Sequence, residues 1–183
     1  SGFLTCFLQS VDKLLSAAHT GKVYRDGLRT VIIGRPNVGK STLLNALLGE
    51  ERALVTDVPG TTRDSIEEII NIRGIPLQIV DTAGLRETND TVELLGIKRT
   101  REVIESAGLI LVLIDASDPF GAEDLIIIKS LPKIPAIIVA NKIDLPHLAD
   151  FPVWHEVVRD FPVVSLSAKE RSGIEDLENM IEQ

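Results

Sequence analysis

Short apolar runs alternate with helical patterns from Leu28 to the end of the 183-residue chain. The apolar runs are rich in Val, Ile and Leu and predict six strands, at residues 28–34, 63–72, 75–81, 108–115, 135–141 and 162–167. The stretches between and after them predict helices, at residues 40–49, 91–106, 122–131, 146–160 and 173–183. Because nearly continuous apolar strands between helices are typical of parallel sheets, the pattern predicts an α/β fold with a mostly parallel six-stranded sheet and helices on both faces.

Glycines mark two boundaries in this pattern. Arg73 and Gly74 separate the second and third predicted strands, so these strands are expected to pair as an antiparallel hairpin with a tight turn. Gly49 closes the apolar pattern of the helix that starts at Lys40 and is expected to end that helix.

Residues 1–27 precede the first strand and carry a helical pattern of their own. Between Phe3 and Ala18, apolar residues recur at three- and four-residue steps and form one stripe, and a polar, turn-rich linker follows. The stripe could pack on the same domain. We favour the alternative, in which residues 1–27 are a remnant of a preceding helical domain and residues 28–183 form the main domain.

Composition narrows the class of protein. The formal net charge is −8 and the isoelectric point is near 4.9, so the surface repels phosphate backbones and this segment is not expected to bind nucleic acid by itself. No apolar run reaches membrane-spanning length, which argues against a membrane partner. Cys6 is the only cysteine, which excludes an internal disulfide or a cysteine-rich metal site. A cytoplasmic setting is the simplest expectation.

The segment GRPNVGKS, residues 34–41, follows a predicted strand and opens a predicted helix. This is the context of a phosphate-binding loop, in which glycines let backbone N–H groups face the phosphates and the helix N-terminus adds positive potential. Lys40 would reach the outer phosphates and Ser41 would ligate Mg²⁺. A chance glycine-rich turn is the alternative. The residues expected to contact the nucleotide here are Asn37, Val38, Gly39, Lys40, Ser41 and Thr42.

Base selection is predicted at two later segments, each directly after an apolar strand. In NKID, Asp144 can accept hydrogen bonds from guanine N1 and N2, Asn141 would support the base and neighbouring loops, and Lys142 lies between them. Adenine presents the opposite pattern and would leave the carboxylate unpaired. In the second segment, SAK, the N–H of Ala168 would bond guanine O6. Each motif is weak alone, but their order indicates a GTP site that also includes Ser167 and Lys169.

Two further segments are expected to meet the terminal phosphate. In DTAG, Asp81 would hold Mg²⁺ and the N–H of Gly84 would contact the γ-phosphate. In GTTRD, Thr62 is preferred over Thr61 as a Mg²⁺ ligand, although both could be ordinary loop hydroxyls. Leu85 follows DTAG where many GTPases carry a glutamine that orients the attacking water. Leucine cannot do this, so hydrolysis would need another group.

The segments GRPNVGKSTLLNALLGEERALVTDVPGTTRD and DTAGLRETNDTVELLGIKRT resemble the G domain of the MnmE (TrmE) family of tRNA-modification GTPases. The resemblance runs from about Thr20 to the C-terminus and implies a Ras-like P-loop GTPase fold that hydrolyses GTP to GDP. Full-length members also have a folate-binding domain, most of a helical domain and a C-terminal cysteine motif. The chain is therefore expected to be an excised G domain.

The resemblance also implies K⁺ activation through a homodimer formed by the switch regions. The matching K⁺ ligands are the Asn37 side chain, the Thr56 and Val58 carbonyls and the Thr61 hydroxyl. Glu93 matches the glutamate that orients the water, so the implied catalytic set is Glu93, Lys40 and Gly84. Two plainer alternatives stay open: Asn37 could only favour a left-handed turn, and Glu93 could only stabilise a helix N-terminus.

For the full-length protein, the resemblance implies work with MnmG, an FAD-containing partner, to add a carboxymethylaminomethyl group to the wobble uridine of tRNA. Two alternatives differ from this function. A ribosome-assembly GTPase of the Era or EngA type shares GRPNVGKST and NKxD but is followed by an RNA-binding domain or a second G domain. A scaffold could instead bind GTP with little turnover.

Overall fold

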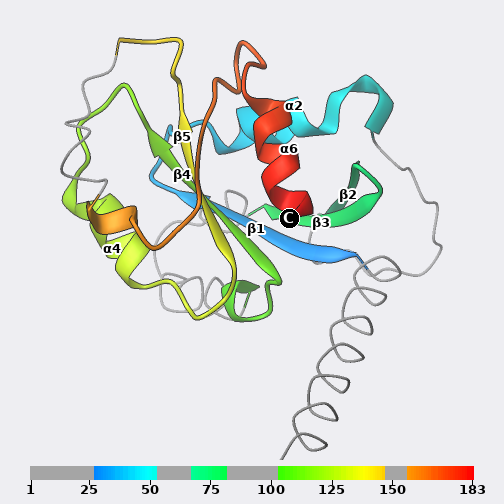
Figure 1. Ribbon diagram of the computed structural model, residues 1–183, viewed down its shortest axis with the longest axis horizontal. Helices are drawn as coiled ribbons and strands as arrows, with labels where there is room; N and C mark the ends of the chain where they lie inside the picture. The colour runs from blue at the N-terminus through cyan, green and yellow to red at the C-terminus, as the bar shows by residue number, and fades with distance from the viewer. Residues whose placement is uncertain (1–26, 53–66, 82–102, 147–155) are drawn as a thin grey trace, which may run out of the picture.

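Six strands form one sheet in the order β2-β3-β1-β4-β5-β6 in the computed structural model, which describes residues 27–52, 67–81, 103–146 and 156–183 (Figure 1). Among the strand pairs of these described residues, β2–β3 is antiparallel and the others are parallel. This confirms the predicted mostly parallel α/β sheet. The elements are β1 (Leu28–Gly34), α2 (Lys40–Arg52), β2 (Glu67–Ile72), β3 (Ile75–Asp81), β4 (Leu109–Asp115), α4 (Ala122–Lys129), β5 (Ala136–Asn141), β6 (Val163–Ser165) and α6 (Ile174–Glu182).

The sheet is apolar on both faces because its central strands lack polar alternation. Every residue of β4 and of β5 is buried. Successive side chains of a strand point to opposite faces, so Leu111 and Leu113 join the core under α2 and α6, whereas Ile110 and Val112 join the core under α4. Figure 1 shows α2 and α6 on one side of the sheet and α4 on the other.

The β2–β3 hairpin turns at Arg73 and Gly74, as the sequence predicts. Both residues have left-handed backbones, with φ of 51° and 90°, which suits a two-residue turn whose twist matches the strands. The Gly74 N–H donates to Asn71 Oδ1 at 2.7 Å and closes the turn. The Arg73 guanidinium also lies within 3.3–3.8 Å of three carboxylates on α6, those of Glu175, Glu178 and Glu182.

Several predicted boundaries differ from those observed. Gly49 does leave the helical conformation, with φ 21° and ψ 150°, but α2 continues past this kink to Arg52. The last strand spans only Val163–Ser165 of the predicted 162–167, and Ser167 pairs with Ser172 in an isolated bridge. Of the predicted helix at 146–160, only 156–158 is helical within the described part of the chain. The N-terminal segment, residues 1–26, lies outside the described residues.

The fold gathers the ends of four strands at one edge of the sheet. Gly34 of β1 lies beside Leu113 of β4, Asp81 of β3 lies beside Ile32 of β1, and Asp115 of β4 pairs with Asn141 of β5. Open parallel sheets bind ligands at the carboxyl ends of their strands. None of the described helices is long and apolar enough to cross a bilayer.

Candidate functional site

The loop after β1 has the backbone that a phosphate cradle requires. Gly34, Asn37 and Gly39 have φ of 153°, 63° and 99°. A Cβ at Gly34 would lie 2.5 Å from the Leu113 carbonyl oxygen, and one at Gly39 would collide with Asn141 Nδ2. Only glycine fits these two positions, which is the physical reason for the GxxxxG spacing. The left-handed Asn37 also agrees with its plainer reading as a turn residue.

Lys40 stands at the first turn of α2 and its side chain bends back over the loop. Lys40 Nζ donates to the carbonyl oxygens of Gly34, at 3.1 Å, and Arg35, at 2.7 Å. The ammonium group therefore sits over the loop that would receive the phosphates. Ser41 and Thr42 follow it at the exposed start of α2, where the positive end of the helix dipole favours an anion.

The buried amide of Asn141 joins two loops that are distant in the sequence. Its Nδ2 donates to the Val38 carbonyl oxygen at 2.8 Å, and its Oδ1 accepts from the Ala168 N–H at 3.0 Å. Asn141 is only 2% exposed, so both bonds lie away from water. The Ala168 N–H, which the sequence assigns to guanine O6, is therefore already engaged by Asn141.

Asp144 presents an exposed carboxylate beside the same loops. Ser167 Oγ donates to Asp144 Oδ1 at 2.6 Å, and the same hydroxyl accepts from the Glu170 N–H at 3.1 Å. The bond from Ser167 is the main reason why the pKa of Asp144 is lowered, with smaller contributions from the charges of Lys169 and Lys142. The carboxylate is therefore ionised at neutral pH and fixed in orientation.

Asp115 is a site residue that the sequence reasoning missed. Its Oδ2 lies 2.5 Å from Lys142 Nζ, and its Oδ1 accepts from the Ser117 N–H at 2.9 Å and from Ser117 Oγ at 2.6 Å. Burial raises the pKa of Asp115, but the bonds from Lys142 and Ser117 outweigh it and the pKa is lowered. An aspartate ending a fully apolar strand at this edge was the available signal.

Asp115→Asn should lower the free energy of unfolding by about 2 kcal/mol at neutral pH, because it weakens hydrogen bonds to a charged group. The folded-state pKa of Asp115 lies below its ordinary 3.8. The stabilisation is thus complete above that pH and is lost as pH falls through the lower, folded-state value. Urea unfolding should show a wild-type advantage at neutral pH that shrinks in strong acid. An advantage that stays the same across this range would contradict the assignment.

Other predicted site residues lie outside the described part of the chain: Thr56, Val58, Thr61, Thr62, Gly84 and Glu93. Asp81 ends β3, and its backbone lies at the same edge of the sheet as the phosphate loop. Within the described residues, no group of three or more His, Cys, Asp or Glu side chains could hold a metal ion. Magnesium in proteins commonly takes one or two carboxylates together with waters and phosphate oxygens of the substrate, so a cluster of three such side chains is not required.

Comparison with known protein families and sequences gives consistent matches. A family described as 50S ribosome-binding GTPase matches residues 29–142, well over half of the chain. The tRNA modification GTPase MnmE of Heliobacterium modesticaldum is 51% identical over 174 residues, which cover 94% of the chain and 37% of that protein. MnmE of Bacillus pumilus is 47% identical over 178 residues, which cover 97% of the chain and 39% of that protein. The chain thus spans less than two-fifths of the length of these relatives.

Solved structures agree with the fold. An Era variant from Aquifex aeolicus, bound to GDP and aluminium fluoride, superposes with a TM-score of 0.63 at 29% identity, covering 84% of this chain and 55% of Era. The G domain of the T. maritima FeoB iron transporter superposes with a TM-score of 0.58 at 23% identity, covering 85% of this chain and 96% of the FeoB chain. At this level of identity the match shows likeness of fold alone. The predicted Ras-like P-loop GTPase fold is confirmed.

Proposed function

We propose that this chain, which belongs to the GTPase family described as 50S ribosome-binding GTPases, binds GTP with Mg²⁺ at the edge of the sheet described above. It is a GTP-hydrolysing G domain of the MnmE type. As such it would serve a tRNA modification enzyme. One observation carries the site: the buried Asn141 amide joins the phosphate loop at Val38 to the loop at Ala168. The loop proposed to hold the phosphates and the loop proposed to hold the base are thereby joined through one side chain.

Guanine is recognised by Asp144. Its ionised carboxylate, oriented by Ser167, accepts from N1–H and N2–H of the base. Adenine has an acceptor at N1 and no amino group at C2, so it would leave this charge unpaired. Guanine O6 would share the Ala168 N–H with Asn141. Lys169 and Lys142, whose charges act on Asp144, would lie beside the base.

The phosphates lie against the loop between Gly34 and Ser41. Lys40 moves its ammonium group from the loop carbonyls to the β- and γ-phosphates, where it offsets negative charge. Ser41, Thr62 and Asp81 would hold Mg²⁺, which supplies further charge neutralisation when bound. The N–H of Gly84 contacts the γ-phosphate and reports its presence.

Hydrolysis with Leu85 in place of glutamine uses two other groups. Glu93 orients the attacking water. Asn37 is exposed on the phosphate loop, where its side-chain oxygen can ligate K⁺ together with groups from Thr56, Val58 and Thr61. A fixed positive charge at this place would act as an arginine finger does in other GTPases. Two copies meeting through their switch regions exclude water from the pair of sites.

GTP turnover by the chain should be at least about tenfold faster in KCl than in NaCl at equal ionic strength, because a cation of the right size stabilises developing charge on the phosphates. The measurement is phosphate release at saturating GTP and several protein concentrations. The rate per chain should also rise with protein concentration in KCl, as a dimeric active form requires.

Asn37→Ala is the matched control, since it removes one cation ligand without changing the base site. In that variant the two salts should give equal rates. Equal rates in wild-type protein would exclude the role of potassium and leave GTP binding intact.

The tRNA role follows from the relatives rather than from the site. Identity to two MnmE proteins is 47% and 51%, against 29% to Era, so the MnmE function is favoured over ribosome assembly. In the full-length protein, GTP turnover would drive opening and closing of a larger assembly with an MnmG-type FAD protein and tRNA. There it would support addition of a carboxymethylaminomethyl group to the wobble uridine.

A further inference from the structure

Arg35, the second residue of the phosphate loop, is tied to the segment that follows β4. Its Nε donates to Asp124 Oδ1 at 2.8 Å, and its Nη1 donates to Asp118 Oδ2 at 3.0 Å. Asp118 lies in the loop before α4 and Asp124 in the first turn of that helix. Eighty-nine residues separate Arg35 from Asp124 in the chain, so these bonds hold together two parts of the fold that the backbone does not.

The contact with Asp124 is buried, and both oxygens of Asp124 accept hydrogen bonds, whereas Nη2 of Arg35 is buried without a hydrogen-bond partner among the described residues. The side chain of Asp124 is 1% exposed and that of Arg35 is 18% exposed. The second oxygen of Asp124 accepts from the Gly121 N–H at 3.0 Å, which fixes the carboxylate at the start of α4. A buried charge without its partner is strongly unfavourable, so each of these two residues keeps the other in place.

Residue 35 is held from two directions. Its carbonyl oxygen accepts from Lys40 Nζ on one side, and its guanidinium group is clasped by Asp118 and Asp124 on the other. Neither side chain oxygen of Asp124 is left to bind a ligand. Nε and Nη1 of Arg35 are both engaged by carboxylates and its Nη2 is buried, so Arg35 serves as an anchor for the loop and not as a phosphate contact.

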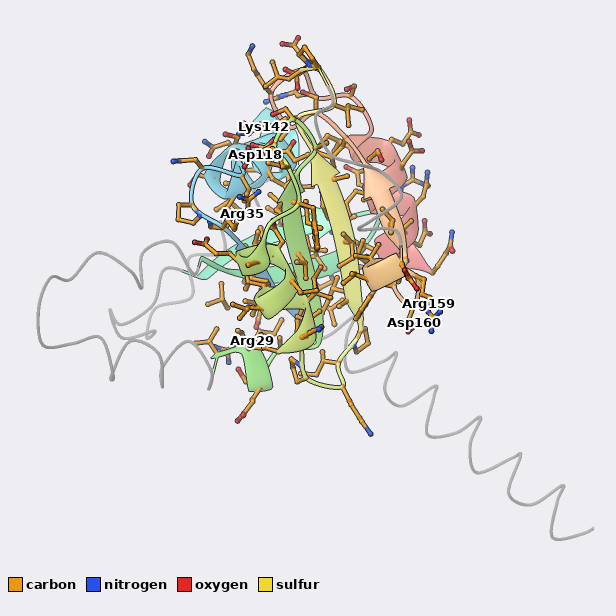
Figure 2. The ribbon with its side chains drawn as sticks, turned by 90° about the vertical axis from the view of Figure 1, so that its left-hand side faces the viewer. Arg29, Arg35, Asp118, Lys142, Arg159 and Asp160 are labelled. Atoms are coloured by element: carbon orange, nitrogen blue, oxygen red, sulfur yellow. The ribbon has the colours of Figure 1, made fainter. Side chains whose placement is uncertain are left out.

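The same short segment anchors the base motif as well. Asp115, at its start, binds Lys142 of NKID, and Asp118 and Asp124 bind Arg35 of the phosphate loop. Figure 2 shows Lys142, Asp118 and Arg35 close together at one end of the molecule, whereas the exposed pair formed by Arg159 and Asp160 lies toward the other end. We call residues 115–124 the acidic brace.

We infer that Arg35 is a positioning residue, which through the acidic brace keeps the phosphate loop in its nucleotide-binding shape before GTP arrives. The inference rests on the proposed function. When a binding-competent shape is only partly populated, apparent affinity falls by that fraction. Loss of the ion pairs that Arg35 makes with Asp118 and Asp124 should therefore raise the GTP concentration needed for binding without altering the chemical step.

A double-mutant cycle on the 183-residue chain tests this inference. Arg35→Gln and Asp124→Asn should each raise the dissociation constant for GTP and the KM by about tenfold, with kcat unchanged within about twofold. The double variant should lose about the same tenfold, because the two side chains act as one unit. Asp118→Asn should cause a smaller loss of GTP affinity, because the Asp118 side chain is half exposed. This variant also tests the inference if the Asp124 variant does not fold.

Arg159→Gln with Asp160→Asn is the matched control, since it removes a similar pair that is exposed and should leave affinity and KM unchanged. Losses that add to about a hundredfold in the double variant would overturn the inference, as would a loss confined to Arg35→Gln, which would indicate direct phosphate contact. Unchanged affinity in the Arg35 and Asp118 variants would also overturn it. Wild-type protein that fails to bind GTP would instead refute the proposed function.

Discussion

Replacing Lys40 with alanine should slow GTP turnover by about 1,000-fold, the scale seen when one group that stabilises transition-state charge is removed. The Lys40 ammonium group is already poised over the phosphate loop, 2.7 Å from the Arg35 carbonyl oxygen. In the proposed mechanism, exchange of the loop carbonyls for phosphate oxygens would place a full positive charge where negative charge grows during bond cleavage. Single-turnover phosphate release at saturating GTP measures the effect on chemistry separately from binding.

Lys133→Ala is the control for this change, because Lys133 is an exposed lysine in the connection from α4 to β5. It should leave turnover as in wild type. A Lys40 variant that keeps turnover within about tenfold of wild type would show that this lysine only holds the loop carbonyls. In that case its contribution would appear in thermal stability instead.

Asp144→Asn should lower affinity for GTP by about 1,000-fold and raise affinity for xanthosine triphosphate. A carboxylate matched to two N–H donors discriminates strongly, because the wrong base leaves the charge without its partners in the complex. Asparagine supplies one acceptor and one donor, and xanthine carries an oxygen where guanine carries its amino group. The hydrogen bond from Ser167 Oγ can still be made to the amide oxygen, so the loop geometry should survive the substitution.

Competition between the two nucleotides, measured with a fluorescent analogue, gives both affinities in one series. Asp160→Asn provides a control carboxylate, which is exposed and outside the site. Loss of GTP binding with no gain for the xanthine nucleotide would mean that Asp144 supports the loop but does not meet the base. Unchanged selectivity would remove Asp144 from base recognition altogether.

Local patterns in the sequence predicted those features that nearby residues determine. The apolar runs gave the six strands, and the pair Arg73-Gly74 gave the hairpin, since a left-handed turn there needs only the two residues themselves. The phosphate loop was predictable for the same reason, because its backbone leaves no room for a Cβ atom at Gly34 or Gly39. The kink at Gly49 was not, since glycine permits a helix end and a helix bend alike.

Contacts between distant segments could not be predicted in the same way. The clasp of Arg35 by Asp124 and the pair of Asp115 with Lys142 depend on the sheet order, which brings the ends of β1, β4 and β5 together. In the sequence, Asp115, Asp118 and Asp124 look like ordinary solvated acids of a loop and a helix start. Only the fold gives them partners of opposite charge.

The two buried hydrogen bonds of the Asn141 amide change how substitutions in NKID are to be interpreted. One buried side chain fastens the phosphate loop, 103 residues away, to the loop that carries Ala168. These two hydrogen bonds couple the loops, so a substitution at Asn141 should disturb the contacts to both ends of a bound nucleotide at once. Weakened nucleotide binding in such a variant would measure the loss of the contact between the two loops. It would reveal little about how the site distinguishes guanine from other bases.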